Sequence, residues 1–180
     1  MKAFLFDCET SGLIENRTVK LDKQPFVLEF YGCLADLKKG KVLKEVSYLI
    51  QPPDPALVTD EITRITGIKY DDLKDAPQFK AVAPKIFEAL EKAPAIIAHN
   101  LSFDREMIDI ESERLGHKMK WPKRQVCSVE QTIHVKGYRL SLSALHEYLF
   151  QEKFEGAHRA RVDVMALLRC CRELHKRDMI

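Results

Sequence analysis

Near its start the chain reads Lys2-Ala3-Phe4-Leu5-Phe6-Asp7-Cys8-Glu9-Thr10-Ser11-Gly12-Leu13, an apolar run that carries two acids two residues apart. Its first part, Lys2 to Cys8, predicts a short strand, and the aromatic residues make that strand a buried one. Alternate side chains of a strand leave on the same face, so Asp7 and Glu9 are expected to point the same way. Two like charges this close together are unusual in a strand that helps to form the core. Either the strand is buried and keeps both acids in spite of their repulsion, or it is half exposed and both acids are solvated. Gly12 gives the chain a flexible exit beside the pair.

The chain has 180 residues, of which 46% are apolar. That length fits one domain with a core of its own, and we expect residues 1–180 to form it. No stretch approaches the ~20 apolar residues of a membrane span, and the start is charged too soon for a signal peptide. We therefore expect a cytoplasmic protein with no membrane association. Five cysteines, with no pair spaced C-x-x-C, favour reduced thiols over a disulfide framework or a zinc site.

Two further strands follow, at Phe26 to Leu37 and Val42 to Gln51, with the turn Lys38-Lys39-Gly40-Lys41 between them. Three prolines in the next four residues cannot continue a ladder, so this part of the sheet ends there. Ala95 to Ala98 and Gln125 to Cys127 are candidate short strands among helical segments. An early meander followed by strands and helices predicts an α/β fold whose mixed β-sheet is flanked by helices.

Helical signals fill most of the remaining chain. Apolar residues recur every three or four positions from Phe79 to Leu90, although Pro84 is expected to kink or restart that helix. Ser128 with Gln131 resembles a capping box, and Ser141 is a candidate N-cap. The other predicted helices are Thr59–Thr66, Asp104–Leu115 and Arg161–Arg177.

Two more acids and one histidine complete a set of candidate site residues. Asp104 lies at a predicted strand-to-helix transition, and His158 precedes Asp163 by five positions. Taken singly, each acid is an ordinary helix N-terminal residue and the histidine an ordinary surface residue. With the pair in the first strand they give four carboxylates and one imidazole, spread over the start, middle and end of the chain. A fold that gathers them could hold two divalent cations and activate water, which is chemistry for cutting phosphodiester bonds.

This set resembles the DEDD superfamily of 3′–5′ exonucleases, in the histidine-bearing branch that includes proofreading exonuclease subunits and ribonuclease T. The resembling segments, in family order, are Phe6-Asp7-Cys8-Glu9-Thr10-Ser11-Gly12-Leu13, Arg64-Ile65-Thr66-Gly67-Ile68, His99-Asn100 through Phe103-Asp104, and His158 with Asp163. They span most of the chain. The resemblance implies a ribonuclease H-like fold with His158 as general base. The residues that would then bind two Mg²⁺ or Mn²⁺ ions are Asp7, Glu9, Asp104 and Asp163.

The resemblance also implies contacts to the terminal nucleotides. The matching residues are Thr10, Leu13, Asn100 and Phe103, with Leu13 as a wedge against the bases, and Ile65 and Thr66 in the base pocket. The sequence departs from the family at Ile14 to Pro25, which is longer than in many relatives and carries Arg17, Lys20 and Lys23. These three cations are either part of a solvated loop or contacts to phosphates upstream of the scissile bond.

Elementary chemistry agrees with the implied site. Carboxylate oxygens are hard ligands that suit Mg²⁺ and Mn²⁺, and four of them offset the charge of two such ions. Imidazole titrates near neutral pH, so His158 could accept the proton of an attacking water. Gly156 lies in the segment Gln151 to Arg161, so we expect His158 on a mobile loop that orders with substrate and metal.

We therefore expect a metal-dependent 3′–5′ exonuclease that releases nucleoside 5′-monophosphates from single-stranded or frayed DNA. An exoribonuclease that trims RNA ends is the first alternative, because no residue pattern here reads the 2′-hydroxyl. A non-catalytic module that docks to a polymerase is the alternative from another class, although this chain keeps all five site residues. A polymerase is also a candidate non-covalent partner, and the sequence leaves the oligomeric state open.

Overall fold

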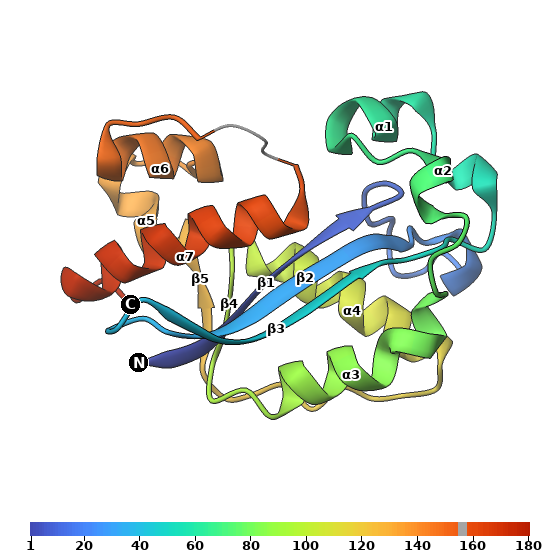
Figure 1. Cartoon of the computed structure of the whole chain (residues 1–180), viewed down its shortest axis with the longest axis horizontal. Coiled ribbons are helices and arrows are strands. Elements are labelled where there is room, and N and C mark those ends of the chain that lie inside the picture. The colour runs from blue at the N-terminus through green and yellow to red at the C-terminus, as the bar shows by residue number, and fades with distance from the viewer. Residues whose placement is uncertain (155–157) are drawn as a thin grey trace.

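The computed structural model describes residues 1–154 and 158–180. Its centre is one five-stranded sheet in the order β3-β2-β1-β4-β5 (Figure 1). β1 pairs antiparallel with β2, which pairs antiparallel with β3, while β4 runs parallel to β1 and β5 parallel to β4. The mixed α/β sheet expected from the early meander is therefore confirmed. The strands are β1 (Lys2–Thr10), β2 (Val27–Asp36), β3 (Lys41–Leu49), β4 (Ile96–Ala98) and β5 (Gln125–Cys127).

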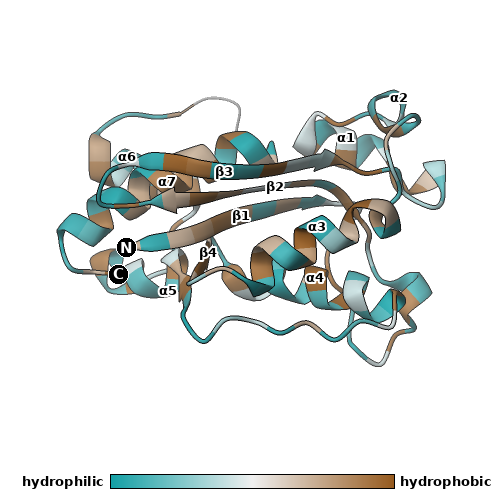
Figure 2. Ribbon diagram, turned by 60° about the horizontal axis from the view of Figure 1, so that its bottom comes forward, coloured by the Kyte–Doolittle hydropathy of each residue, from teal (hydrophilic) through white to brown (hydrophobic). Residues whose placement is uncertain are grey.

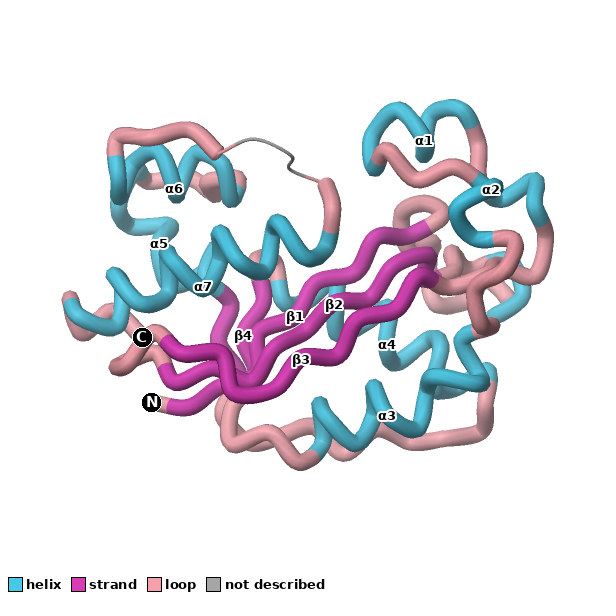
Figure 3. The backbone as a smooth tube through the Cα atoms, in the orientation of Figure 1, coloured by secondary structure: helices cyan, strands magenta, loops and turns pink. Residues whose placement is uncertain are grey.

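Helices flank this sheet on both sides (Figures 1 and 3). α3 and α4 lie along one face and α7 lies across the other, with α5 and α6 beside α7. The short α1 and α2 extend beyond the end of the sheet at which β1 stops. The helices are η1 (Leu21–Lys23), η2 (Pro55–Leu57), α1 (Asp60–Thr66), α2 (Tyr70–Leu73), α3 (Phe79–Glu91), α4 (Leu101–Arg114), α5 (Ser128–Lys136), α6 (Leu142–Phe150) and α7 (Ala160–Lys176).

Alternation along β1 decides which way the two acids face. Phe4 and Phe6 belong to the apolar cluster shared with α3 and α4, whereas Leu5 belongs to the cluster shared with α7. Figure 2 shows many apolar residues, drawn in brown, along the neighbouring strands of the sheet. Because side chains two residues apart share a face, Asp7 and Glu9 follow Leu5 onto the face covered by α7. The N-terminal part of β1 thus contributes to the core, and its C-terminal part presents carboxylates.

Three details differ from the sequence-based expectations. α3 passes through Pro84 without restarting, and Lys80, whose carbonyl loses its helical donor there, is exposed to solvent. α4 begins at Leu101 because Asn100, in the left-handed region at φ 70°, turns the chain directly from β4 into the helix. Ser128 does not form a capping box, since its Oγ lies 2.7 Å from His99 Nδ1.

The expected N-cap at Ser141 is present. The Ser141 hydroxyl accepts a hydrogen bond from the Ala144 N–H, and Gly67 ends α1 in the left-handed conformation. Within residues 1–154 and 158–180, no helix has the length and apolar character needed to cross a membrane.

Candidate active site

The carboxylates predicted from the sequence come together where β1 ends. Carboxylate oxygens of Asp7, Glu9 and Asp163 all lie within 4.8 Å of one another, so β1 and the first turn of α7 contribute to one cluster. Asp104 approaches from the first turn of α4, where it is buried and its Oδ1 accepts the Cys8 N–H at 3.0 Å. The positive ends of two helix dipoles thus partly offset the charges of Asp104 and Asp163.

Glu29, on β2, is a fifth carboxylate that the sequence analysis did not single out. It is the register partner of Glu9, only 6% of it is exposed, and it lies on the same face of the sheet. Its Oε2 accepts hydrogen bonds from Arg159 Nε at 3.1 Å and from the Ala160 N–H at 3.2 Å. Its Oε1 accepts a third from Arg159 Nη2 at 3.2 Å. One acid inside the apolar run Val27–Tyr31 was the available signal, because a buried strand rarely keeps a charge without a purpose.

Burial and mutual repulsion raise the pKa values of this cluster. Burial, then the nearby Asp104, Glu9 and Asp163, raise the pKa of Asp7 well above its usual range. Burial, Asp163 and Glu29 raise the pKa of Glu9 to about 7, although Arg159 acts in the opposite direction. Burial raises the pKa of Asp104 as well, against the hydrogen bond from Cys8.

The pKa of Asp163 is also raised by burial, while the hydrogen bond from His158 opposes the rise. A group of acids with raised pKa values stores electrostatic repulsion that a bound cation would relieve. Hard oxygen donors that converge in this way fit Mg²⁺ or Mn²⁺.

His158 lies at the edge of the same cluster. Its backbone N–H donates to Asp163 Oδ2 at 2.9 Å, and its φ of 69° is in the left-handed region. His158, Asp7 and Asp163 line a common cavity of about 350 Å³ together with the N-terminal residues of α6. The structure therefore brings His158, Asp7 and Asp163 to one cavity. The mobile loop expected at Gly156 lies outside the described residues.

The predicted substrate contacts differ in how freely they could reach a ligand. Leu13 is 82% exposed and Ile65 is 42% exposed. Thr10 is buried, and its hydroxyl donates to the Gly12 carbonyl. Thr66 is also buried, and its hydroxyl donates to the Ile62 carbonyl and accepts from the Ile68 N–H at the end of α1.

Asn100 and Phe103 lie close to Asp104 in sequence, at the start of α4. The Asn100 Oδ1 accepts hydrogen bonds from Arg139 Nη2 at 2.8 Å and from Ser102 Oγ at 3.3 Å, so its amide nitrogen points away from both donors. Phe103 is partly buried against the core shared by α3 and α4.

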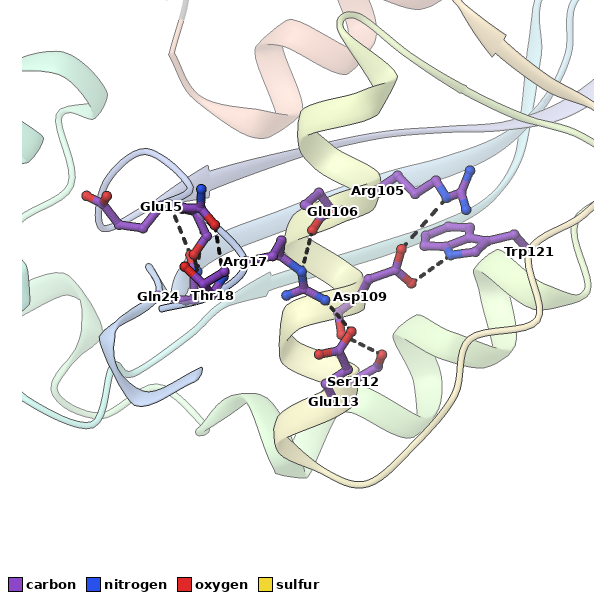
Figure 4. Close-up of polar contacts among 11 residues, drawn as sticks. Glu15, Arg17, Thr18, Gln24, Arg105, Glu106, Asp109, Ser112, Glu113 and Trp121 are labelled. Atoms are coloured by element: carbon purple, nitrogen blue, oxygen red, sulfur yellow. Dashed lines mark hydrogen bonds and ion pairs between the residues drawn. The ribbon is translucent and has the colours of Figure 1, made fainter. Parts of the chain in front are cut away.

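The segment from Ile14 to Pro25 is attached to α4. Arg17 forms ion pairs with Glu106, at 2.8 Å, and with Glu113 (Figure 4). Within the segment, the Gln24 side chain accepts a hydrogen bond from the Glu15 N–H and donates to the carbonyls of Glu15 and Asn16. These ion pairs favour the alternative in which Arg17 belongs to the surface of the loop, because two carboxylates already hold its guanidinium. Lys20 and Lys23 remain exposed.

Comparisons with known proteins agree with this fold. The family model described as "Exonuclease" matches residues 4–170. The DNA polymerase III subunit epsilon of Treponema pallidum is 30% identical over 176 residues, which are 94% of this chain and 72% of that protein. The DNA polymerase III PolC-type of Caldanaerobacter subterraneus is 26% identical over 164 residues, 90% of this chain but 11% of that protein.

Solved structures share the fold. The nuclease domain of 3′hExo, a DEDDh family member, superposes with a TM-score of 0.79 at 15% identity and covers 98% of this chain and 92% of its own. Exonuclease X in complex with 5′ overhanging duplex DNA gives a TM-score of 0.67 at 20% identity over 97% of this chain and 92% of its own. The ribonuclease H-like fold expected from the sequence is confirmed.

The chain belongs to the exonuclease family, whose model spans most of its length. It spans about a tenth of the length of the PolC-type relative and about a quarter of another relative, Protein NEN1 of Arabidopsis thaliana.

Proposed function

We propose that residues 1–180 act as one exonuclease domain that removes nucleotides from the 3′ end of DNA, single-stranded or frayed, and releases nucleoside 5′-monophosphates. One observation carries this proposal: carboxylate oxygens of Asp7, Glu9 and Asp163 converge within 4.8 Å beside His158. A cluster of like charges is unfavourable without a counter-charge, and divalent cations supply that counter-charge in sites that act on phosphates.

In this proposal Asp7, Glu9, Asp104 and Asp163 hold two Mg²⁺ or Mn²⁺ ions. When bound, the ions supply positive charge to the reacting phosphate and lower the pKa of water. Asp7 has the central part, because its pKa is raised by each of the other three acids. Glu29 is left out of the ligand set, since both of its oxygens already accept hydrogen bonds from Arg159 and Ala160.

His158 is the proposed general base. It lines the cavity that Asp7 and Asp163 also line, and the residue is exposed. A neutral imidazole can take the proton from an attacking water, and general-base catalysis of this kind is worth about 10²–10⁴ in rate. The hydrogen bond from the His158 N–H to Asp163 orients the backbone from which the ring projects.

The substrate contacts remain those proposed from the resemblance. Leu13 has the exposure that a wedge between bases requires, and Ile65 has the exposure of a base-pocket residue. Asn100 presents its amide nitrogen as a donor, because Arg139 and Ser102 occupy its oxygen. We assign Thr10, Phe103 and Thr66 to the shape of the pocket, since each is at least partly buried.

The relatives' names favour DNA as the substrate and a polymerase as the partner. Two of the relatives described above are named as parts or forms of DNA polymerase III, and in the PolC-type protein the matched region is a small part of the named polymerase. Among proteins of the same fold, one structure contains duplex DNA and another concerns a histone mRNA stem-loop. RNA therefore remains the second candidate substrate.

The test is digestion of 5′-labelled DNA and RNA oligonucleotides of the same sequence. Strands should shorten stepwise from the 3′ end with Mg²⁺ or Mn²⁺ and stay intact with chelator, and DNA should be degraded faster than RNA. Asp7→Asn should be inactive, whereas Asp75→Asn, which changes an exposed acid outside the cluster, should behave as wild type. Cleavage that persists in chelator, or products that begin inside a 3′-blocked strand, would exclude the proposed reaction.

A further inference from the structure

Glu29 differs from Asp104 and Asp163 in that both of its carboxylate oxygens accept hydrogen bonds from the protein, whereas those two acids each use one. Its two carboxylate oxygens accept hydrogen bonds from Arg159 Nε, Arg159 Nη2 and the Ala160 N–H, at 3.1, 3.2 and 3.2 Å. Arg159 follows His158 directly and is the N-cap residue of α7, and Ala160 begins that helix. One buried side chain on β2 therefore fixes the start of α7.

The contact between Glu29 and the start of α7 connects the two parts of the proposed site, which lie on β1 and at the start of α7. On one side, β2 pairs with β1 so that Glu29 lies opposite Glu9. On the other side, the first turn of α7 carries Asp163, and His158 comes directly before Arg159. The position of α7 relative to β1 is therefore set at Glu29, close to the point at which the carboxylates must converge.

The backbone of His158 needs such support. Its φ of 69° is in the left-handed region, which a residue with a side chain adopts only when its surroundings over-determine it. Asp163 holds His158 from inside α7 through the 2.9 Å hydrogen bond to the His158 N–H. Glu29 holds the next two residues from the sheet. Together these contacts fix the chain on the C-terminal side of the histidine.

The charge of Glu29 is balanced within the protein. Arg159 forms an ion pair with it at 3.1 Å, and only 8% of the Glu29 side chain is exposed. Glu29 still adds to the repulsion on Glu9, but Arg159 gives it a counter-charge within the protein, so it does not require a cation of its own. This separates Glu29 from the four acids proposed as metal ligands.

We propose that Glu29 is a positioning residue, which acts through Arg159 and Ala160 to place His158 and Asp163 for the reaction. The inference rests on the proposed exonuclease function and adds a residue to it. Removal of a residue that orients ligands typically reduces metal affinity or activity by about 10–100-fold. Loss of Glu29 should therefore lower kcat and weaken Mn²⁺ binding, and should change KM little because Glu29 does not touch the substrate.

The test compares Glu29→Gln with Arg159→Gln, the double variant and the control Glu111→Gln. Glu111 is matched to Glu29, since it is 3% exposed, accepts a backbone N–H from β2 at Val27 and pairs with an arginine, Arg114. Single-turnover cleavage, KM and Mn²⁺ affinity are measured for each folded variant. Glu29→Gln keeps the size of the side chain, so that folding is preserved.

We expect Glu29→Gln and Arg159→Gln each to lower kcat by about 10-fold or more, and the double variant to lose little beyond either single variant because both break one contact. Glu111→Gln should lower stability but leave kcat and Mn²⁺ affinity near wild type. Wild-type kcat and Mn²⁺ affinity in Glu29→Gln would overturn the proposal. A rise in KM with Arg159→Gln alone would also overturn it, and would make Arg159 a phosphate contact.

The two proposals fail separately. A wild-type protein that degrades neither DNA nor RNA would refute the proposed function, and Mn²⁺ affinity would still show whether Glu29 positions Asp163. A wild-type protein that degrades DNA, together with an equally active Glu29→Gln, would refute only the positioning role.

Discussion

The two ends of α4 lie in opposite electrostatic environments. At its N-terminus Asp104 joins Asp7, Glu9 and Asp163, an acidic cluster in which burial and mutual repulsion raise the pKa values. At its C-terminus Arg114 donates to three carbonyls of residues 21–25, forms an ion pair with Glu111 and stacks 3.7 Å from the centre of the Phe26 ring.

We call the C-terminal group, made of Arg17, Gln24, Glu111 and Arg114, the α4 anchor. Its charges are complementary and its hydrogen bonds are closed within the protein, so its effect is on stability. The charges of the acidic cluster are alike and await a counter-charge, so its effect is on binding. The comparison teaches that the balance of charge distinguishes the two ends of α4. The C-terminal end, where charges are paired, stabilises the fold, and the N-terminal end, where like charges gather, is suited to bind a cation.

The largest expected effects fall in the acidic cluster. Asp7→Ala should weaken Mn²⁺ binding and reduce cleavage by ~10³-fold or more, because several kcal/mol of charge stabilisation depend on the bound ions. His158→Ala should reduce the rate by about 10²–10⁴ while Mn²⁺ binding survives. Calorimetric Mn²⁺ titration and single-turnover rates separate the two roles. Equally poor Mn²⁺ binding by both variants would make His158 a ligand and its assignment as base wrong.

A large loss of stability is expected in the α4 anchor. Arg114→Met leaves the buried Glu111 carboxylate without its cation and the carbonyls of residues 21–25 without their donor. Breaking a buried pair in this way costs about 3–5 kcal/mol. Urea unfolding should show the same loss in chelator and in Mn²⁺. A loss seen only with Mn²⁺ present would mean that the anchor belongs to the metal site.

The third effect is a pH dependence confined to the acidic cluster. The pKa of Glu9 is raised to about 7 in the folded chain, from an ordinary value of 4.5 in the unfolded chain. The folded state therefore binds more protons than the unfolded state between these values, and metal-free stability falls as pH rises from about 4.5 to 7. Glu9 accounts for up to ~3 kcal/mol of this fall.

Glu9→Gln removes that titration. In chelator the variant should gain stability relative to wild type as the pH is raised from 5 to 7.5, which urea midpoints at the two pH values will show. Parallel pH profiles for the two proteins would mean that Glu9 ionises freely despite its neighbours.

The smallest effects are expected at the exposed side chains of the segment from Ile14 to Pro25. Arg17→Ala should change stability by about 1 kcal/mol at most, because its ion pairs are half exposed, and should leave the salt dependence of single-strand binding unchanged. Replacing Lys20 and Lys23 by alanine should flatten the salt slope by ~1.4 if each meets one phosphate. A flatter slope with Arg17→Ala would mean that Arg17 leaves α4 to bind the substrate.

Much of the fold could be predicted from local patterns. The apolar run of β1, the meander of β2 and β3, and the stripe of α7 each carry their own periodicity. The departures arise where long-range contacts override local preference: Ser128 meets His99 instead of capping its helix, and Arg17 meets α4.

The site divides in the same way. Asp7, Glu9, Asp104, His158 and Asp163 belong to recognisable segments, and the structure gathers them. The role of Glu29 could be identified only from the strand register and the contact to α7, which connect residues 130 positions apart. The local sequence marks Glu29 as an unusual acid within an apolar run, but it does not show that Arg159 is its partner.

The most direct test of the central claim is the melting temperature of the wild-type protein with chelator and with Mn²⁺. If the acidic cluster is a divalent-cation site, Mn²⁺ at ~100 times its dissociation constant should add about 2.7 kcal/mol. The melting temperature should then rise by roughly 5–10 °C for a domain of this size. Asp7→Ala should show little of this rise, and Arg114→Met should show all of it from a lower starting point. An unchanged melting temperature in wild type at saturating Mn²⁺ would contradict the account.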